Sequence, residues 1–175
     1  GEPLPQEHGY PLRSLPLGWT GANCVKWLTK ITVMDRPYEG FFMDRVYRVY
    51  YEGQQPHEGE PVTAMPLKSF VTRPRGETIE HSGPVSVLGV AYAGEAEIEC
   101  VQVSVDGGER WHEAELIGPR EPYAWRQWRY SYDPPGSTHT VVVRMVDRDG
   151  NVQTSEETDP APSGPSGWVS KEFQS

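Results

Sequence analysis

Cysteine is scarce in this 175-residue chain, and Cys24 and Cys100 lie far apart in the sequence. Two such cysteines do not predict a disulfide framework. Basic residues are also in the minority, since 16 Lys and Arg stand against 25 Asp and Glu and give a formal net charge of −9. General nucleic-acid binding needs a basic face, so no nucleic-acid partner is expected. No apolar run approaches the roughly 20 residues that cross a bilayer, so no membrane span is expected either.

Several catalytic signatures are also missing. The sequence has no P-loop, no G-x-S-x-G motif and no G-x-G-x-x-G dinucleotide fingerprint. Outside the N-terminal segment, the histidines lack the spacing of metal ligands and are expected at the surface or at an interface; they are His57, His81, His112 and His139. Any chemistry must therefore come from other residues, and no metal ligand is assigned.

Short strands follow one another from Ser82 onward, with turn residues between them. Strands are predicted around Val85–Ala91, Ile98–Val105, a partner strand with Trp111, Ala114 and Leu116, Trp125–Tyr132, a strand with Val141, Val143 and Met145, and Trp168–Phe173. Because these strands are short and closely spaced, the pattern predicts an all-β sandwich.

Two local features of the sandwich can also be predicted. Ile98 lies on the opposite parity from Val101, Val103 and Val105, so a β-bulge near Cys100 is needed to bring them to one face. Asp106-Gly107-Gly108 is typical of a hairpin turn with positive φ.

The remaining segments are less regular. Residues 1–30 are rich in glycine and proline, and Val25–Val33 is predicted as one short strand that the chain enters from this loop. Met34–Gly76 is predicted to be irregular, and its many aromatic residues would leave a large exposed apolar patch. The tail from Thr154 to Gly167 is rich in Ser, Pro, Gly and Glu and is expected to be mobile.

The most informative stretch places three basic side chains among glycines near the N-terminus. His8-Gly9-Tyr10-Pro11-Leu12-Arg13 is followed by Gly21-Ala22-Asn23-Cys24-Val25-Lys26-Trp27-Leu28. Arginine and lysine supply donors for phosphate or carboxylate, and glycine lets backbone amides approach a ligand closely. The pattern therefore suits a polar anionic cofactor, and the alternative is a surface loop with ordinary basic residues.

These two segments resemble the molybdopterin-binding segment of the sulfite oxidase family, which includes plant-type nitrate reductases and bacterial sulfane dehydrogenases. Met65–Ser69 is similar to the family's linker, and Val103–Gly108, Trp111 and Ala124–Trp128 are similar to signatures of its C-terminal domain. The resemblance implies two parts. Residues 1–74 would be the incomplete, loop-rich C-terminal segment of a molybdopterin-binding domain, and 75–175 an immunoglobulin-like (E-set type) dimerisation domain, so that the fold is mainly β.

The resemblance also implies roles for particular residues. By matching position, His8, Arg13, Cys24 and Lys26 would contact the molybdopterin. Cys24 replaces the usual Ser or Asn, and a thiol is a weaker donor than a hydroxyl. Arg126 would reach the anionic substrate as a catalytic residue. The alternative for this arginine is a structural cation stacked on the neighbouring tryptophans.

Neither cysteine matches the residue that binds molybdenum in this family. The chain is therefore expected to be the C-terminal portion of a molybdoenzyme, inactive and without cofactor on its own. The intact enzyme would be a homodimer that carries molybdenum–molybdopterin, oxidises sulfite or a related sulfur anion, and passes electrons to a partner such as a cytochrome. Two alternatives stay open, a nitrate reductase fragment and a non-catalytic β-sandwich binding module. The resemblance slightly favours export but leaves the compartment open.

Overall fold

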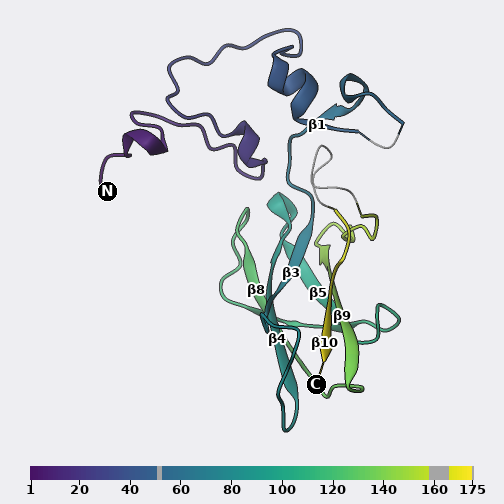
Figure 1. The fold of residues 1–175 in the computed structure, drawn as a ribbon. Coiled ribbons are helices and arrows are strands. Elements are labelled where there is room, and N and C mark those ends of the chain that lie inside the picture. The colour runs from purple at the N-terminus through teal and green to yellow at the C-terminus, as the bar shows by residue number, and fades with distance from the viewer. Residues whose placement is uncertain (51–52, 158–165, 175) are drawn as a thin grey trace. The chain divides into compact units, whose positions relative to one another are not determined.

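The computed structural model describes residues 1–50, 53–157 and 166–174 (Figure 1). The described residues form two compact units, 1–65 and 66–157 with 166–174. Each unit is described by itself. The sequence boundary at 74/75 stays a prediction, although the second unit already includes β3 (Lys68–Arg73).

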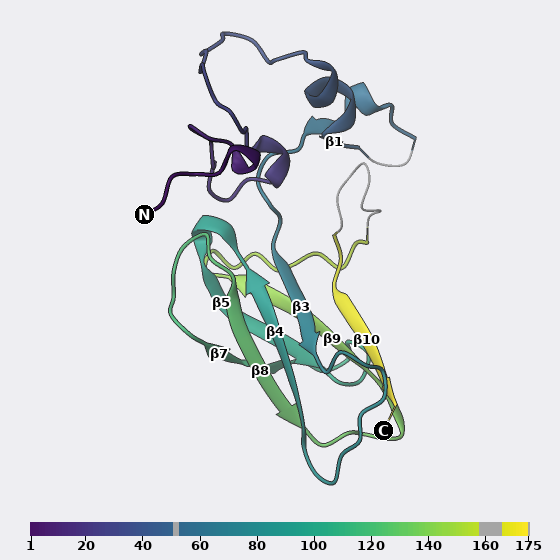
Figure 2. The same cartoon turned by 60° about the vertical axis from the view of Figure 1, so that its left-hand side comes forward.

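The second unit is a sandwich of two four-stranded antiparallel sheets (Figures 1 and 2). One sheet has the order β3–β4–β8–β7, in which β4 is Val85–Tyr92, β8 is Arg126–Tyr132 and β7 is Glu115–Ile117. The other has the order β10–β9–β5–β6, made of Val169–Gln174, Thr138–Asp147, Ile98–Ser104 and His112–Glu113. A short 3₁₀ turn, η5 (Gly94–Ala96), joins β4 to β5. The predicted mainly β sandwich is confirmed.

Strand alternation builds the core between the sheets. The inward side chains of β9 are Val141, Val143 and Met145, and all three are fully buried. Trp128 enters from the opposite sheet, and Phe173 closes the core from β10, again fully buried. Apolar residues at every second position therefore determine which face of each strand points inward.

Both predicted local features are present. The register between β5 and β9 shifts between Ile98 and Cys100, which is the expected bulge. In the hairpin turn, Gly107 and Gly108 take φ values of 76° and 103°. The Asp106 carboxylate accepts hydrogen bonds from the Arg110 backbone N–H, the Ser104 hydroxyl and the Glu109 backbone N–H, and these bonds hold the pKa of Asp106 below its usual value.

The segment after this turn contradicts the prediction of a single partner strand. His112–Glu113 (β6) pairs with β5, whereas Glu115–Ile117 (β7) pairs with β8 in the opposite sheet. The Ala114 amide still donates to Val101 at 2.8 Å, and the chain then crosses to the other sheet. Periodicity could not reveal this crossing, because an apolar residue such as Leu116 would pack on the core from a strand of either sheet.

The first unit contains short elements only. They are the 3₁₀ turns η1 (Gln6–His8), η2 (Gly21–Asn23) and η4 (Pro56–Glu58), the π-helical turn η3 (Phe42–Val46), and the two-stranded pair β1 (Arg48–Val49) and β2 (Glu60–Pro61). Among the described residues, the buried hydrophobic side chains all belong to the sandwich. The expected exposure of the aromatic stretch is confirmed, since Tyr38, Phe41 and Phe42 are more than half exposed.

Two predictions for the first 76 residues are wrong. Val25–Val33 is not a strand, because the backbone bends at Lys26–Trp27 and Trp27 adopts a left-handed φ of 53°. The region 34–76 is not irregular throughout, because it includes β1, β2 and β3. In β3 the polar Ser69 is fully buried and the aromatic Phe70 is exposed. The alternation of polar and apolar residues therefore does not predict this strand.

The C-terminal tail is described only at its two ends. Ser166 donates to the Glu156 carbonyl, and the Gln153 amide donates to the Gly167 carbonyl. Residues 158–165 of the stretch expected to be mobile lie outside the described residues. Within the described part of the chain, no helix is long and apolar enough to cross a membrane.

His139 was expected at the surface or at an interface, but it lies inside the sandwich unit and is only 6% exposed. The Tyr132 hydroxyl forms a 2.7 Å hydrogen bond with His139 Nε2, and this bond allows the imidazole to be buried. Desolvation lowers the pKa of His139, and nearby His81 lowers it further, while a Gly136 backbone contact has the opposite effect. Desolvation is the largest of these effects and determines the direction. Burial also raises the pKa of Tyr132 to about 12.

We expect the sandwich to lose stability as the pH falls below about 6.5, the pKa of an unfolded histidine. The folded pKa of His139 lies below that value, so the unfolded state binds the proton more readily in this window. Urea unfolding at pH 7.5, 6.5 and 5.5 should show the decline. His139→Gln should flatten it, whereas His112→Gln, at an exposed histidine, should not. A midpoint that stays constant across this range would contradict the prediction.

Candidate functional site

Three neighbouring carbonyl groups of η1 organise the basic residues of the first unit. The Gln6 carbonyl accepts a hydrogen bond from Trp27 Nε1 at 2.8 Å, and the Glu7 carbonyl accepts one from Lys26 Nζ at 2.8 Å. The His8 carbonyl accepts one from the Arg13 guanidinium at 3.2 Å. These three carbonyls, called the η1 carbonyl row below, hold Arg13 and Lys26 beside the same short turn.

Gly9 allows the two cations to lie this close together. It is buried and has a φ of 111°, which favours glycine. A Cβ atom at this position would lie 3.1 Å from the Lys26 Cβ and 3.2 Å from the Arg13 Cβ. The two basic residues therefore flank Gly9, and a larger residue there would push them apart.

The remaining donors of this cluster suit an anion. Arg13 Nε is buried and has no hydrogen-bond partner among the described residues. An ammonium group has three N–H donors, and Lys26 uses one of them on Glu7. Two cations with unused donors match the chemistry of a phosphate group. The residues present therefore fit the phosphate end of an anionic cofactor.

The structure brings together three of the four predicted cofactor residues directly. His8 contributes its carbonyl to the η1 carbonyl row, while its side chain is exposed. Cys24 follows η2 and lies two residues before Lys26, and its amide donates to Gly21 at 3.0 Å. A contact from the Cys24 amide to a ligand would have to replace that bond. Sequence reasoning missed Trp27, whose only signal was its position beside Lys26.

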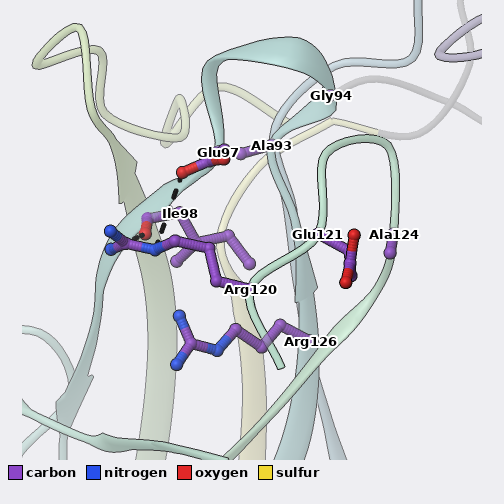
Figure 3. Close-up of a pocket in the computed structure, with 8 residues that line it drawn as sticks. All are labelled: Ala93, Gly94, Glu97, Ile98, Arg120, Glu121, Ala124 and Arg126. Carbon is purple, nitrogen blue, oxygen red and sulfur yellow. Dashed lines mark hydrogen bonds and ion pairs between the residues drawn. The ribbon is translucent and has the colours of Figure 1, made fainter. Parts of the chain in front are cut away.

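Arg126 lies in the second unit and so apart in the chain from this cluster. It begins β8 and has the same parity as the buried Trp128, so its side chain projects between the two sheets at one end of the sandwich. Figure 3 shows it near Arg120. Its Nε is buried without a hydrogen-bond partner among the described residues.

The pocket around Arg126 is small and carries several charges (Figure 3). Its space is about 10 Å³, which is room for roughly one water molecule. Glu97 forms ion pairs with Arg120 at 3.6 Å and with Arg148 at 3.1 Å. The Glu97 carboxylate is thus shared between two other arginines, and Arg126 has no ion pair among the described residues. A guanidinium without an ion pair is a suitable partner for an oxyanion at the mouth of the pocket.

The alternative of Arg126 as a stacked cation finds no contact in the described residues. Trp125 packs on Phe70 and Tyr92, with ring centroids 5.8 and 5.2 Å away, and Trp128 lies in the core. The arginine that does stack on indoles is Arg144, which lies 3.9 Å from the Trp111 ring.

Cys100 lies in β5 and is half-buried. Burial raises the pKa of its thiol, and the carboxylates of Glu113 and Glu99 raise it further. A thiol must be deprotonated to bind a metal well, so this environment disfavours a ligand role. Among the described residues, no group of three or more His, Cys, Asp or Glu side chains is placed to hold a metal ion.

Two protein families match the chain. Residues 1–42 match the oxidoreductase molybdopterin binding domain, and residues 60–159 match the Mo-co oxidoreductase dimerisation domain. The first match includes the η1 carbonyl row, and the second includes most of the sandwich.

Three known proteins are similar to the chain over most of its length. The chain is 35% identical to mitochondrial sulfite oxidase of Homo sapiens over 87% of its own length and 30% of that protein. It is 29% identical to nitrate reductase [NADH] 2 of Phaseolus vulgaris, covering 87% of this chain and 20% of the relative. The sulfane dehydrogenase SoxCD of Paracoccus pantotrophus superposes with a TM-score of 0.76 at 27% identity, over 99% of this chain and 48% of that one. The chain thus spans less than half of each of these relatives.

Proposed function

Because the chain belongs to the sulfite oxidase family, of which it forms a C-terminal portion, we propose that it serves an enzyme that oxidises sulfite or a related sulfur anion. Its first unit contributes contacts to a molybdopterin, and its second unit is a dimerisation domain. The observation that carries the proposal is the placement of Arg13 and Lys26 around Gly9 on the η1 carbonyl row.

The residues of the first unit bind and orient the cofactor. Arg13 and Lys26 attract its phosphate, and the buried Arg13 Nε gains the acceptor that it lacks. His8 and Cys24 lie on the turns that border this cluster and complete the contact set. When bound, molybdenum–molybdopterin supplies the oxygen-atom transfer that the oxidation of sulfite requires.

In the second unit, Arg126 attracts the anionic substrate as a catalytic residue. A guanidinium group presents a planar set of donors that suits an oxyanion such as sulfite. Arg126 has no ion pair among the described residues, so its charge is available to such a ligand. The sandwich pairs with a second copy to form a homodimer, and the electrons pass to a redox partner such as a cytochrome.

Nitrate reduction is the second candidate function, and the similarity to nitrate reductase [NADH] 2 of Phaseolus vulgaris favours it. The same cationic cluster would bind the same cofactor in either case. Turnover of the intact enzyme with sulfite and with nitrate as alternative substrates separates the two functions. A non-catalytic binding module is the rival from another class, and it would leave Arg13 and Lys26 without a ligand.

We expect Arg13→Gln and Lys26→Gln to lower the cofactor content of the intact enzyme. Each substitution removes a charge-assisted contact worth about 1.5–3 kcal/mol, which corresponds to at least a tenfold weaker binding of the cofactor. The readouts are molybdenum per protein by mass spectrometry and the fluorescence of pterin released on denaturation.

The matched controls for this experiment are Lys30→Gln and Arg36→Gln, at exposed basic residues of the same unit. They should leave both readouts unchanged. Full cofactor content in the Arg13 and Lys26 variants would contradict the proposed contacts. An intact protein that never contains pterin would favour the binding module.

A further inference from the structure

The backbone of Glu97 takes a conformation that is open essentially only to glycine. Its φ is 62° and its ψ is 163°. Glu97 lies between η5 and β5, and it lines the same small pocket as Arg126. Strained backbone costs free energy, and it tends to occur where a side chain must be held in one place for function. The strain therefore points to a role for the Glu97 side chain.

The Glu97 carboxylate bridges two arginines through a single oxygen. Its Oε2 atom lies 3.6 Å from Arg120 Nε and 3.1 Å from Arg148 Nη1. This oxygen is buried, although both guanidinium groups are partly exposed. Glu97 is therefore the shared counter-ion of Arg120 and Arg148, and Figure 3 shows its contact with Arg120.

Backbone contacts fix the positions of these two arginines further. The Arg148 amide donates to the Glu97 carbonyl at 3.2 Å. The Arg120 guanidinium donates to the carbonyl of the next residue, Ile98, at 3.4 Å. Both arginines are thus held on the short segment that begins β5.

The three arginines at this end of the sandwich are in different states. Arg120 and Arg148 pair with Glu97, whereas Arg126 forms no ion pair within the part of the chain that the structure describes. Three guanidinium groups around one oxyanion would bind it far more tightly than one, because each adds charge-assisted hydrogen bonds. Glu97 therefore determines how many arginines are available to an anion in this pocket.

We propose that Glu97 is a positioning residue, which limits the substrate site to Arg126 and so keeps it weak enough to release its product. This inference rests on the proposed oxidation of sulfite. In that reaction sulfite and water give sulfate, two protons and two electrons, and the electrons leave to the proposed redox partner. Sulfate is an oxyanion like sulfite, with one more oxygen to accept hydrogen bonds. A site with more unpaired arginines would therefore retain the product.

The first test measures sulfate binding to the full 175-residue chain by isothermal titration calorimetry. Glu97→Gln removes the charge, keeps the size and releases Arg120 and Arg148. Sulfate should then bind at least about tenfold more tightly than to the wild type, as expected for one added charge-assisted contact. Glu121→Gln is the matched control, because Glu121 lines the same pocket but is exposed and has no ion pair among the described residues. It should change the affinity less than about twofold.

Glu97→Gly separates this role from a purely structural one. Glycine adopts a φ of 62° without strain, so this variant should melt no lower than Glu97→Gln. It should still show the tighter binding of sulfate. Adding Arg120→Gln to Glu97→Gln should remove most of the gain. A purely structural ion pair predicts lower melting temperatures and no gain in sulfate binding.

Steady-state kinetics of the intact enzyme give the second test. In Glu97→Gln, tighter binding of both anions should lower KM for sulfite, and slower release of sulfate should lower kcat. Sulfate should inhibit this variant at least about tenfold more strongly than the wild type. A damaged site would instead raise KM and weaken the inhibition by sulfate.

The outcomes distinguish the role of Glu97 from the proposed function. Normal turnover of sulfite, with unchanged binding of sulfate and unchanged inhibition in Glu97→Gln, would overturn the role and leave the function standing. An equal gain in sulfate binding from Glu121→Gln would also overturn it, because any lost negative charge would then have the same effect. An intact wild-type enzyme that does not turn over sulfite would overturn the proposed function, and the product-release role with it.

Discussion

Replacing Gly89 by alanine is expected to destabilise the sandwich by about 3 kcal/mol or more, at the upper end of overpacking effects. Gly89 lies in the centre of β4, paired with Val71 and Trp128. A Cβ atom there would overlap both the Phe70 carbonyl oxygen and the indole of Trp128. Neither neighbour can give way cheaply, since one is backbone and the other is fully buried.

Urea unfolding of the full chain measures this effect. The midpoint of Gly89→Ala should fall sharply, and Gly89→Val should not fold. Gly83→Ala is the matched control, because nothing lies within 4 Å of its added Cβ atom. Its midpoint should stay within a few tenths of a molar of the wild type. Equal midpoints for Gly89→Ala and Gly83→Ala would show that Trp128 does not pack on the glycine.

Replacing Arg126 by methionine is expected to lower catalytic efficiency without lowering stability. In the intact enzyme, the loss of a charge-assisted contact worth about 1.5–3 kcal/mol should lower kcat/KM for the anionic substrate by about tenfold to more than a hundredfold. In the isolated chain, the melting temperature should stay the same or rise. Arg126 Nε is buried without an acceptor, and methionine removes that unpaired group while keeping most of the apolar stem.

Steady-state kinetics and a melting curve on the same variant test both halves of this prediction. Arg129→Met is the matched control, because Arg129 lies in the same strand but pairs with Glu115 at the surface. It should leave kcat/KM unchanged. Unchanged kinetics together with a lower melting temperature in Arg126→Met would remove the substrate role and make this arginine a structural residue.

Sequence periodicity was sufficient for the sandwich because most of its strands bury alternate apolar residues. The inward set of β9 and the bulge at Cys100 could both be predicted in this way. Periodicity did not predict β3, because the buried residue there is a serine, Ser69. Its hydroxyl donates a hydrogen bond to Gln153, which is 84 residues away in the sequence and so outside any local pattern. Periodicity failed again at β6 and β7, because the choice of sheet depends on pairing with strands that are distant in the sequence.

In the candidate site, residue types predicted the charges but not the arrangement. Arg13 and Lys26 were identified as donors from their chemistry, and their roles stay a prediction. The bend that brings Lys26 and Trp27 to the η1 carbonyl row has no periodic signal, because it depends on two side-chain-to-backbone hydrogen bonds. The lack of an ion pair for Arg126 within the described ranges could not be predicted either, because the nearby Glu97 pairs with two other arginines that are distant in the sequence.

The position of β10 has a consequence for synthesis on the ribosome. Phe173 closes the core, and Gln174 bonds to Glu77 and Ile79 near the start of the sandwich, so the first and last strands of the unit are both needed before it closes. Translation adds about 5–20 residues per second, so roughly 5–20 s separate the emergence of β3 from that of β10. β9 ends at Asp147 and β10 begins at Val169, so for roughly the last 1–5 s of that interval the edge of β9 lacks its neighbour, and the nascent chain offers an unpaired strand to other nascent chains or to chaperones.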